Sequence, residues 1–273
     1  MRFSKWHGIG NDYIIVARED LEAAGIEVTP EWARALCDRH FGIGADGILV
    51  MGPSETADAH MEIRNPDGST AEMCGNGIRM AARWLVEDAG HPRGRLAIDT
   101  AGGTVYPHVE DGGMVRVDMG RPEQQGRLTV NAAGTAFVGD VVRVGNPHFV
   151  VRAAPSDAHV LEAGPVLERA EAFPDRTNVE FYEPTGASSV RMRVWERGVG
   201  ETLACGSGAC ATGLVAVHAG DATAPVEVEL PGGVLEIDVA DDGSVTMTGP
   251  ARKVYDGVLT RHAPTTSSLE APA

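Results

Sequence analysis

Two cysteines in this chain stand in the same short motif, Cys-Gly-x-Gly, in a setting that suits acid–base chemistry. Cys74 and Cys205 each follow a strand-like segment and precede an apolar run typical of a helix. The first amides of a helix lack intrahelical partners and carry partial positive charge, so we expect the pKa of a thiol there to fall toward neutrality. The same amides bind carboxylates, and the glycines let a ligand approach the backbone. The pattern predicts a thiolate–thiol pair that moves a proton.

The two motifs belong to a longer internal repeat. Residues 60–77 align with residues 191–208 without a gap, at a constant offset of 131 residues, which brings Asn65 opposite Glu196. Strand, loop, cysteine and apolar helix follow at identical spacing in both copies, which indicates two related domains. With both helix starts at one substrate, one thiolate can remove an α-proton while the opposite thiol donates a proton to the other face. The carbanion's charge then spreads into a carboxylate held by fixed amide dipoles.

This chemistry requires neither a cofactor nor a metal, and the sequence predicts neither. Lysine occurs only at positions 5 and 253, and neither lies in a phosphate-binding context that would suit pyridoxal phosphate. No Walker loop or dinucleotide fingerprint occurs. Cys205 and Cys210 lack the spacing of a zinc-ligand pair. We expect Cys37 and Cys210 to be core residues.

The elements that must position the two cysteines are mostly short strands between glycine turns. Strand-like runs occur at 14–16, 48–50, 115–119, 141–144, 148–151, 191–195 and 226–230, and helical patterns at 30–39, 74–85 and 205–217. The last helical pattern is apolar on nearly all sides, which is typical of a buried helix.

We therefore predict an α+β fold with two pseudo-symmetric domains. Each is expected to be a curled, mostly antiparallel sheet around a central helix, with the active site in the cleft between the domains. The predicted domains are residues 1–120, carrying Cys74, and residues 121–262, carrying Cys205. A flexible tail rich in Pro, Ser and Thr is predicted for residues 263–273.

The overall composition limits the possible partners and location. The net charge of −16 comes from 39 acidic and 23 basic residues, and such a surface repels nucleic acids. The sequence has no apolar stretch of about 18 residues and no signal-peptide core, so we expect no membrane association and a cytoplasmic location.

The chain resembles the diaminopimelate epimerase family over nearly its whole length, to about Gly257. The resemblance implies cofactor-independent interconversion of LL- and meso-2,6-diaminopimelate, a step in lysine and peptidoglycan precursor biosynthesis, by a homodimer. The motifs that carry it are His7-Gly-Ile-Gly-Asn-Asp, Gly42-Ile-Gly-Ala-Asp-Gly, Asn65-Pro-Asp-Gly-Ser, Cys74-Gly-Asn-Gly, Gly145-Asn-Pro-His, Arg176-Thr-Asn-Val-Glu, Glu196-Arg-Gly, Ala204-Cys-Gly-Ser-Gly-Ala, Leu230-Pro-Gly-Gly and Gly249-Pro-Ala.

The resemblance also implies roles for individual residues. Cys74 and Cys205 match the acid and base, and His148 and Glu196 match residues that adjust the cysteine pKa values. The matches to substrate contacts are Asn11, Asn65, Asn146, Asn178, Glu196 and Arg197, and the amide cradle for the reacting carboxylate matches Gly75-Asn76 and Gly206-Ser207. An arginine fork suits a distal carboxylate, and a glutamate suits the distal ammonium group.

The sequence departs from the family pattern at three positions. Gly47 stands where some members carry a glutamine that contacts the substrate, Ser207 where threonine is frequent, and Met80 where a further cysteine is often found. None of these changes removes a catalytic group.

Three other functions are compatible with parts of the pattern. A histidine or proline-type racemase on the same scaffold would act on another amino acid. A thiol redox protein would turn over with a thiol reductant, without stereoinversion. A non-catalytic amino-acid binding protein would bind its ligand after loss of either cysteine.

Overall fold

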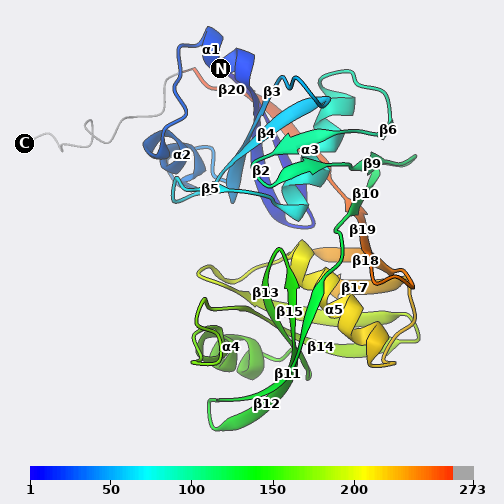
Figure 1. Cartoon of the computed structure of the whole chain (residues 1–273). Helices are drawn as coiled ribbons and strands as arrows, with labels where there is room; N and C mark the ends of the chain where they lie inside the picture. Colours follow the sequence, from blue (N-terminus) through cyan, green and yellow to red (C-terminus); the bar gives the residue numbers. More distant parts are fainter. Residues whose placement is uncertain (261–273) are drawn as a thin grey trace, which may run out of the picture. The chain divides into compact units, whose positions relative to one another are not determined.

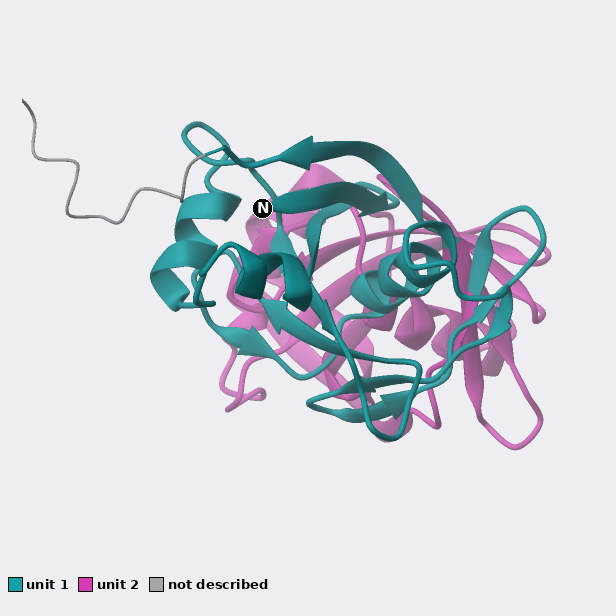
Figure 2. Ribbon diagram, turned by 90° about the horizontal axis from the view of Figure 1, so that it is seen from above, with its two compact units in different colours: residues 1–115, 250–273 teal, residues 116–249 magenta. Residues whose placement is uncertain are grey.

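Apolar residues that alternate between glycine turns give this chain short strands, and these strands dominate both halves. The computed structural model describes residues 1–260. They form two compact units, which Figure 2 shows in two colours: unit 1 contains residues 1–115 and 250–260, and unit 2 contains residues 116–249. The domain division predicted at residues 120 and 262 stays a prediction, and the predicted tail at 263–273 lies outside the described residues.

Unit 1 contains one mixed sheet with the strand order β20-β1-β2-β3-β4-β7-β8, with β5 paired to β4. Its elements are β1 (Arg2–Gly8), β2 (Asn11–Ala17), α1 (Arg18–Ala23), α2 (Pro30–Cys37), β3 (Gly47–Gly52), β4 (Ala59–Arg64), β5 (Thr70–Ala71), α3 (Gly75–Glu87), β6 (Gly94–Arg95), β7 (Ile98–Thr100), β8 (Gly103–Val105), β9 (His108–Val109) and β20 (Arg252–Val258). Strand β10 (Met114–Asp118) runs across the boundary into unit 2.

Unit 2 is built around the strand order β11-β12-β13-β14-β15-β17-β18-β19, with β16 paired to β15. Its elements are β11 (Glu123–Ala132), β12 (Thr135–Val144), β13 (Asn146–Arg152), the π-helix η1 (Ala158–Ala163), α4 (Gly164–Glu168), β14 (Asn178–Gly186), β15 (Ser189–Glu196), β16 (Gly200–Glu201), α5 (Gly206–His218), β17 (Val226–Leu230), β18 (Gly233–Val239) and β19 (Val245–Pro250).

The two units repeat one strand topology. In unit 1, β1-β2-β3-β4-β7-β8 pair alternately antiparallel and parallel, and β12-β13-β14-β15-β17-β18 show the same alternation in unit 2. The register agrees too, because Arg64 opposes Thr70 in unit 1 and Trp195 opposes Glu201 in unit 2, both at the offset of 131 residues. The predicted α+β fold with two pseudo-symmetric domains is confirmed.

A long helix covers one face of each sheet. Helix α3 packs on β1, β2 and β3, and α5 packs on the strands from β12 to β18, as Figure 1 shows for each unit separately. The opposite faces carry apolar clusters: α1 and α2 pack there in unit 1, and η1 and α4 in unit 2. Because strand residues alternate between faces, Tyr13 and His148 lie on the sides that face α3 and α5.

The elements expected from the sequence around the cysteines are confirmed. The helical pattern at 30–39 became α2, and the patterns after the two cysteines became α3 and α5. Helix α5 is buried along almost its whole length, as its apolar composition predicted. Within residues 1–260, no helix is long and apolar enough to cross a membrane.

Candidate active site

Cys74 is the N-cap residue of helix α3, directly before Gly75, in the setting the sequence predicted. Its backbone is extended, with φ −141° and ψ 116°, and its sulfur accepts a hydrogen bond from the Gly77 amide at 3.3 Å. A second donor, the Tyr13 hydroxyl, lies 3.5 Å from the same sulfur. The side chain is half-buried. At the start of α3, the Cys74 sulfur therefore lies within hydrogen-bond distance of two donors.

A chain of hydrogen bonds fixes the polar side chains beside Cys74. The Arg79 guanidinium donates to Asn76 Oδ1 at 2.7 Å, Asn76 donates to Asn11 Oδ1 at 3.1 Å, and Asn11 donates to Asp46 Oδ2 at 3.0 Å. Since arginine only donates and a carboxylate only accepts, the two charged ends determine which way both amides point. Asn76, a residue of the predicted carboxylate cradle, is almost fully buried.

Asn65, a predicted substrate contact, and Gly47, a departure from the family pattern, also lie in unit 1. Asn65 lies in the turn after β4, where its side-chain amide donates to the Ser69 hydroxyl at 2.9 Å. Gly47 lies under the ring of Tyr13: a Cβ at this position would come within 2.5 Å of the Tyr13 Cε1 atom and 2.9 Å of the Arg64 carbonyl oxygen. The tyrosine ring thus occupies the space that a side chain at position 47 would need.

Cys205 opens helix α5 with the same extended backbone, at φ −126° and ψ 108°, but its surroundings differ. Burial raises the pKa of its thiol well above the ordinary value, and the carboxylates of Glu196 and Glu180 raise it further, against lowering contributions from the Gly208 amide and the Ser207 hydroxyl. The prediction that the helix start lowers the pKa of this thiol is therefore wrong. It counted the helix dipole and left out burial and the two acids.

His148 lies fully buried in unit 2 between two polar partners. Its Nδ1 atom is 2.7 Å from Glu180 Oε1, and its Nε2 atom is 2.9 Å from Asn146 Oδ1. Glu180 is also fully buried, and its second carboxylate oxygen makes no hydrogen bond in the described structure. A Cβ on Gly208 would lie 2.8 Å from Glu180 Oε1 and 3.2 Å from the Cys205 sulfur, so the carboxylate and the thiol share the first turn of α5.

Glu196 connects the end of β15 to the same helix start. It accepts a hydrogen bond from the Thr202 hydroxyl. Burial raises the pKa of Glu196, the bond from Thr202 lowers it, and the charge of Glu180 raises it again. Contact with the Cys205 thiol contributes a smaller lowering effect, which places the carboxylate beside the sulfur. A carboxyl group with a raised pKa is suited to exchange a proton with a neighbouring thiol.

Hydrogen bonds to the side chains of Asn178 and Glu168 fix the backbone of the loop that carries Arg197. Asn178 accepts a hydrogen bond from the Arg197 backbone amide at 2.9 Å and donates to the Pro147 carbonyl oxygen at 2.9 Å. The buried carboxylate of Glu168 accepts from the Gly198 amide at 2.8 Å. The Arg197 guanidinium is exposed and donates to the Asp175 carbonyl oxygen at 3.3 Å. Its position leaves it accessible to an anionic ligand.

The structure thus groups the predicted residues within each unit. Unit 1 brings together Cys74, Gly75, Asn76 and Asn11, while Asn65 lies in its own turn. Unit 2 gathers Cys205, Gly206, Ser207, His148, Asn146, Glu196, Asn178 and Arg197 along the start of α5 and the ends of β13, β14 and β15.

Sequence reasoning missed Tyr13, Glu168 and Glu180. The signal for two of them was available, because Tyr13 follows Asn11 by two residues and Glu180 follows Asn178 by two residues. In a strand, residues two apart lie on the same face, so each shares a face with a predicted contact.

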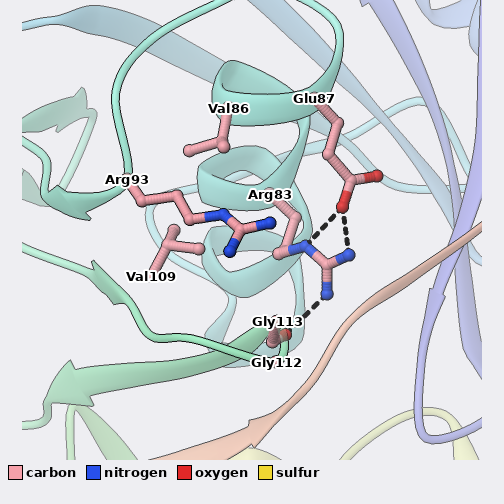
Figure 3. Close-up of a pocket in the computed structure, with 7 residues that line it drawn as sticks. All are labelled: Arg83, Val86, Glu87, Arg93, Val109, Gly112 and Gly113. Carbon is pink, nitrogen blue, oxygen red and sulfur yellow. Dashed lines mark hydrogen bonds and ion pairs between the residues drawn. The ribbon is translucent and has the colours of Figure 1, made fainter.

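A cavity at a different part of α3 contains none of these residues. It has a volume of about 210 Å³ and is lined by Arg83, Val86, Glu87, Arg93, Val109, Gly112 and Gly113. Figure 3 shows the Arg83 guanidinium bonded to Glu87 and to the Gly113 carbonyl oxygen, at 2.6 Å for the latter. Because these contacts occupy Arg83, the cavity is a less suitable site for chemistry than the helix start.

Comparison with known proteins shows the family to which the chain is similar. The family model of diaminopimelate epimerase matches residues 3–124 and 141–254. The chain is 43% identical to the diaminopimelate epimerase of Synechococcus elongatus, over 95% of this chain and 98% of that protein. It is 42% identical to the diaminopimelate epimerase of Desulforudis audaxviator, over 96% of this chain and 100% of that protein.

Solved structures share the fold at lower identity. A predicted epimerase from Pseudomonas aeruginosa superimposes with a TM-score of 0.71 at 18% identity, over 95% of this chain and 99% of that one. A probable proline racemase from Agrobacterium radiobacter gives a TM-score of 0.71 at 18% identity, over 95% of this chain and 92% of that one. At such identities the likeness concerns the fold alone.

Proposed function

The chain belongs to the diaminopimelate epimerase family, and we propose that it is an isomerase that interconverts LL- and meso-2,6-diaminopimelate without a cofactor. Relatives that carry this activity in their names are 42–44% identical to the chain over nearly its full length. The observation that carries the proposal is the pair of equivalent helix starts, each opened by a cysteine followed by Gly-x-Gly. On this assignment the enzyme serves lysine and peptidoglycan precursor biosynthesis.

In the proposed mechanism, Cys74 and Cys205 act on opposite faces of one α-carbon. The thiolate of one cysteine takes the α-proton, and the thiol of the other donates a proton to the opposite face, so the configuration inverts. The sulfurs exchange roles in the reverse direction. The backbone amides at the two helix starts, Gly75-Asn76 and Gly206-Ser207, are proposed to hold the reacting carboxylate and the charge that develops on it.

The raised pKa values of Cys205 and Glu196 in unit 2 support different roles for the two cysteines. With its pKa well above the ordinary value, the Cys205 thiol is suited to start a cycle protonated, as the donor. When Cys205 must be the base, Glu196 is the carboxylate beside it that can receive the proton. His148, held between Glu180 and Asn146, places an imidazole beside these acids.

The non-reacting end of the substrate is proposed to bind to Arg197, Glu196 and the asparagines. An exposed guanidinium can hold the distal carboxylate with two parallel hydrogen bonds, and a carboxylate can accept from the distal ammonium group. Asn65, Asn146 and Asn178 add donors and acceptors, and Asn11 adds a contact near Cys74. A substrate without the second amino-acid end would not make these contacts.

We further propose that the enzyme acts in the cytoplasm as a homodimer. The homodimer rests on the family resemblance, and sedimentation of the purified protein would test it.

Proton NMR of LL-diaminopimelate in D₂O, with purified protein, a reductant and a metal chelator, tests the proposed reaction. We expect the meso isomer to appear with deuterium at the inverted α-carbon, without added pyridoxal phosphate. L-proline and L-histidine in parallel tubes should show no exchange. Absence of exchange from diaminopimelate by the fully reduced protein would contradict the proposal, and exchange of proline or histidine instead would assign the substrate of a racemase.

A further inference from the structure

We propose that Tyr13 is a catalytic residue in unit 1, where its phenol donates a hydrogen bond to the Cys74 sulfur and is the counterpart of His148 in unit 2. This inference rests on the proposed function, because it assumes that Cys74 is one of the two reacting thiols. It assigns a role to a residue that the family motifs leave without one.

The contact itself is direct. The Tyr13 hydroxyl lies 3.5 Å from the Cys74 sulfur, and the tyrosine is 5% exposed, so little water competes for the bond. The Gly77 amide reaches the same sulfur at 3.3 Å. Hydrogen bonds to a charged acceptor are stronger than those to a neutral one. The phenol therefore favours the state in which Cys74 carries negative charge.

The equivalence with His148 follows from the repeated topology. Strand β2 begins Asn11-Asp-Tyr, and its equivalent β13 begins Asn146-Pro-His, each directly after a glycine. Both strands make the parallel pair of their sheet, in which Tyr13 opposes Gly47 and His148 opposes Asn178. Tyr13 and His148 thus occupy the third residue of equivalent strands, on the face that meets the cysteine-bearing helix.

A second pair of positions supports the same alignment. Two residues further along each parallel pair, and so on the same face of the sheet, Ile15 opposes Leu49 and Val150 opposes Glu180. A Cβ on Gly77 would meet Leu49 Cδ2 at 3.3 Å and the Cys74 sulfur at 3.5 Å. A Cβ on Gly208 would meet Glu180 and the Cys205 sulfur in the same way. The cysteine, its helix glycine and both facing strand residues therefore correspond between the units.

Gly47 belongs to this arrangement. Its missing side chain leaves room for the Tyr13 ring, whose Cε1 and Cζ atoms would lie 2.5 Å and 3.0 Å from a Cβ there. The glutamine that some relatives carry at this position is incompatible with Tyr13 in its present place. The glycine at position 47 makes room for the Tyr13 ring, and the ring in that place brings its hydroxyl to the Cys74 sulfur.

During turnover the phenol keeps its proton. It donates to the Cys74 thiolate before the α-proton is abstracted, and its oxygen can accept from the thiol afterwards, so no proton is gained or lost at Tyr13.

The test is the Tyr13→Phe variant, read by the alkylation rate of each cysteine against pH, with peptides quantified by mass spectrometry. Loss of the donor should slow the alkylation of Cys74 about 3- to 10-fold, because the sulfur loses one of its two hydrogen-bond donors. Cys205 in the same sample should keep its profile. The matched control is Tyr182→Phe, whose hydroxyl bonds to Asp221 at 2.9 Å in unit 2; it should leave Cys74 unchanged.

A second variant guards against a folding effect. Gly47→Ala pushes against the Tyr13 ring and should shift Cys74 alkylation in the wild-type background, but much less in the Tyr13→Phe background. An unchanged Cys74 profile in Tyr13→Phe, or equal shifts at Cys74 and Cys205, would overturn the proposal.

The assay needs no substrate, so it separates this inference from the proposed function. A Cys74-specific shift in a protein that fails to epimerise diaminopimelate would leave the phenol–thiolate contact in place and reject only the substrate. In an active enzyme, Tyr13→Phe should also lower kcat/KM about 3- to 30-fold, and a wild-type kcat/KM would count against the contact's role in catalysis.

Discussion

The starts of α3 and α5 have the same backbone and the same cysteine, yet their neighbours differ in kind. Beside Cys74 the facing strand residues are Tyr13 and Leu49, a neutral donor and an apolar side chain. Beside Cys205 the equivalent positions hold His148 and Glu180, a base and an acid in contact. The comparison teaches that the repeated fold determines the position of each thiol, while burial and the neighbouring side chains differ between the two helix starts.

The largest expected effect tests whether both helix starts are needed. Cys74→Ala and Cys205→Ala should each lower the rate of epimerisation by about 10²- to 10⁴-fold, since each removes one of the two proton-transfer groups. The control is Cys37→Ala, because burial raises the pKa of that thiol to about 12 and keeps it inert. Either single variant with near-wild-type turnover would refute the two-cysteine mechanism.

Replacing the acid of unit 2 tests the origin of the asymmetry. In Glu180→Gln, the carboxylate no longer raises the pKa of Cys205, so alkylation of Cys205 at fixed pH should be roughly threefold faster. Cys74 should react at its wild-type rate. Glu183→Gln, on the same strand, is the control. If Glu180→Gln slows Cys205 or leaves its rate unchanged, the carboxylate does not raise the pKa of the thiol.

A matched pair of glycine variants compares the space at the two helix starts. Gly208→Ala would place a methyl group 2.8 Å from the buried Glu180 carboxylate, whereas Gly77→Ala meets its nearest atoms at 3.3 Å. Both variants gain about 1 kcal/mol of helix propensity. We expect kcat/KM to fall about tenfold further in Gly208→Ala than in Gly77→Ala. Equal losses in kinetic assays would mean that the Glu180–His148 contact tolerates displacement.

The smallest effect concerns stability and pH. Burial raises the pKa of Glu196 in the folded state, so its contribution to stability is present below the unfolded pKa of about 4.3 and is lost as pH rises through the folded value. Glu196→Gln, which resembles the neutral form, should therefore melt about 2–4 °C above wild type at pH 7 and close to wild type near pH 4. Differential scanning calorimetry at the two pH values would show it; a lower melting temperature at pH 7 would contradict the direction.

The sequence predicted the two helix starts because their motif is local. Cys74 and Cys205 are each recognised as the residue before a helix by neighbours within three residues, and the repeat established their correspondence. Strand runs and helices around them could be read from periodicity. The pKa of Cys205 could not, because burial and the charges of Glu180 and Glu196 come from strands distant in the chain.

The two-residue spacing places Tyr13 and Glu180 on the faces of Asn11 and Asn178, but their partners were missed for a different reason. The segments that carry Tyr13 and His148 share little besides Gly-Asn, so the repeat there is invisible until the strand register aligns it. Glu180 stands in an apolar run, where periodicity favours a strand and says nothing about a buried partner. Cross-strand neighbours depend on register, which a single sequence does not specify.

Strand β20 gives unit 1 an unusual order of assembly. It pairs with β1 from Arg2 opposite Val258 to His7 opposite Arg252, although all of unit 2 lies between these segments in the chain. Pairing of such distant segments is slow to form, because a very long loop must close first. During synthesis, strand β1 of unit 1 lacks its partner strand β20 until the chain has been made through Val258. Unit 2 is continuous from residue 116 to residue 249, so all of its strands are synthesised before β20. Synthesis of unit 1 therefore begins first, but unit 2 can complete its sheet first.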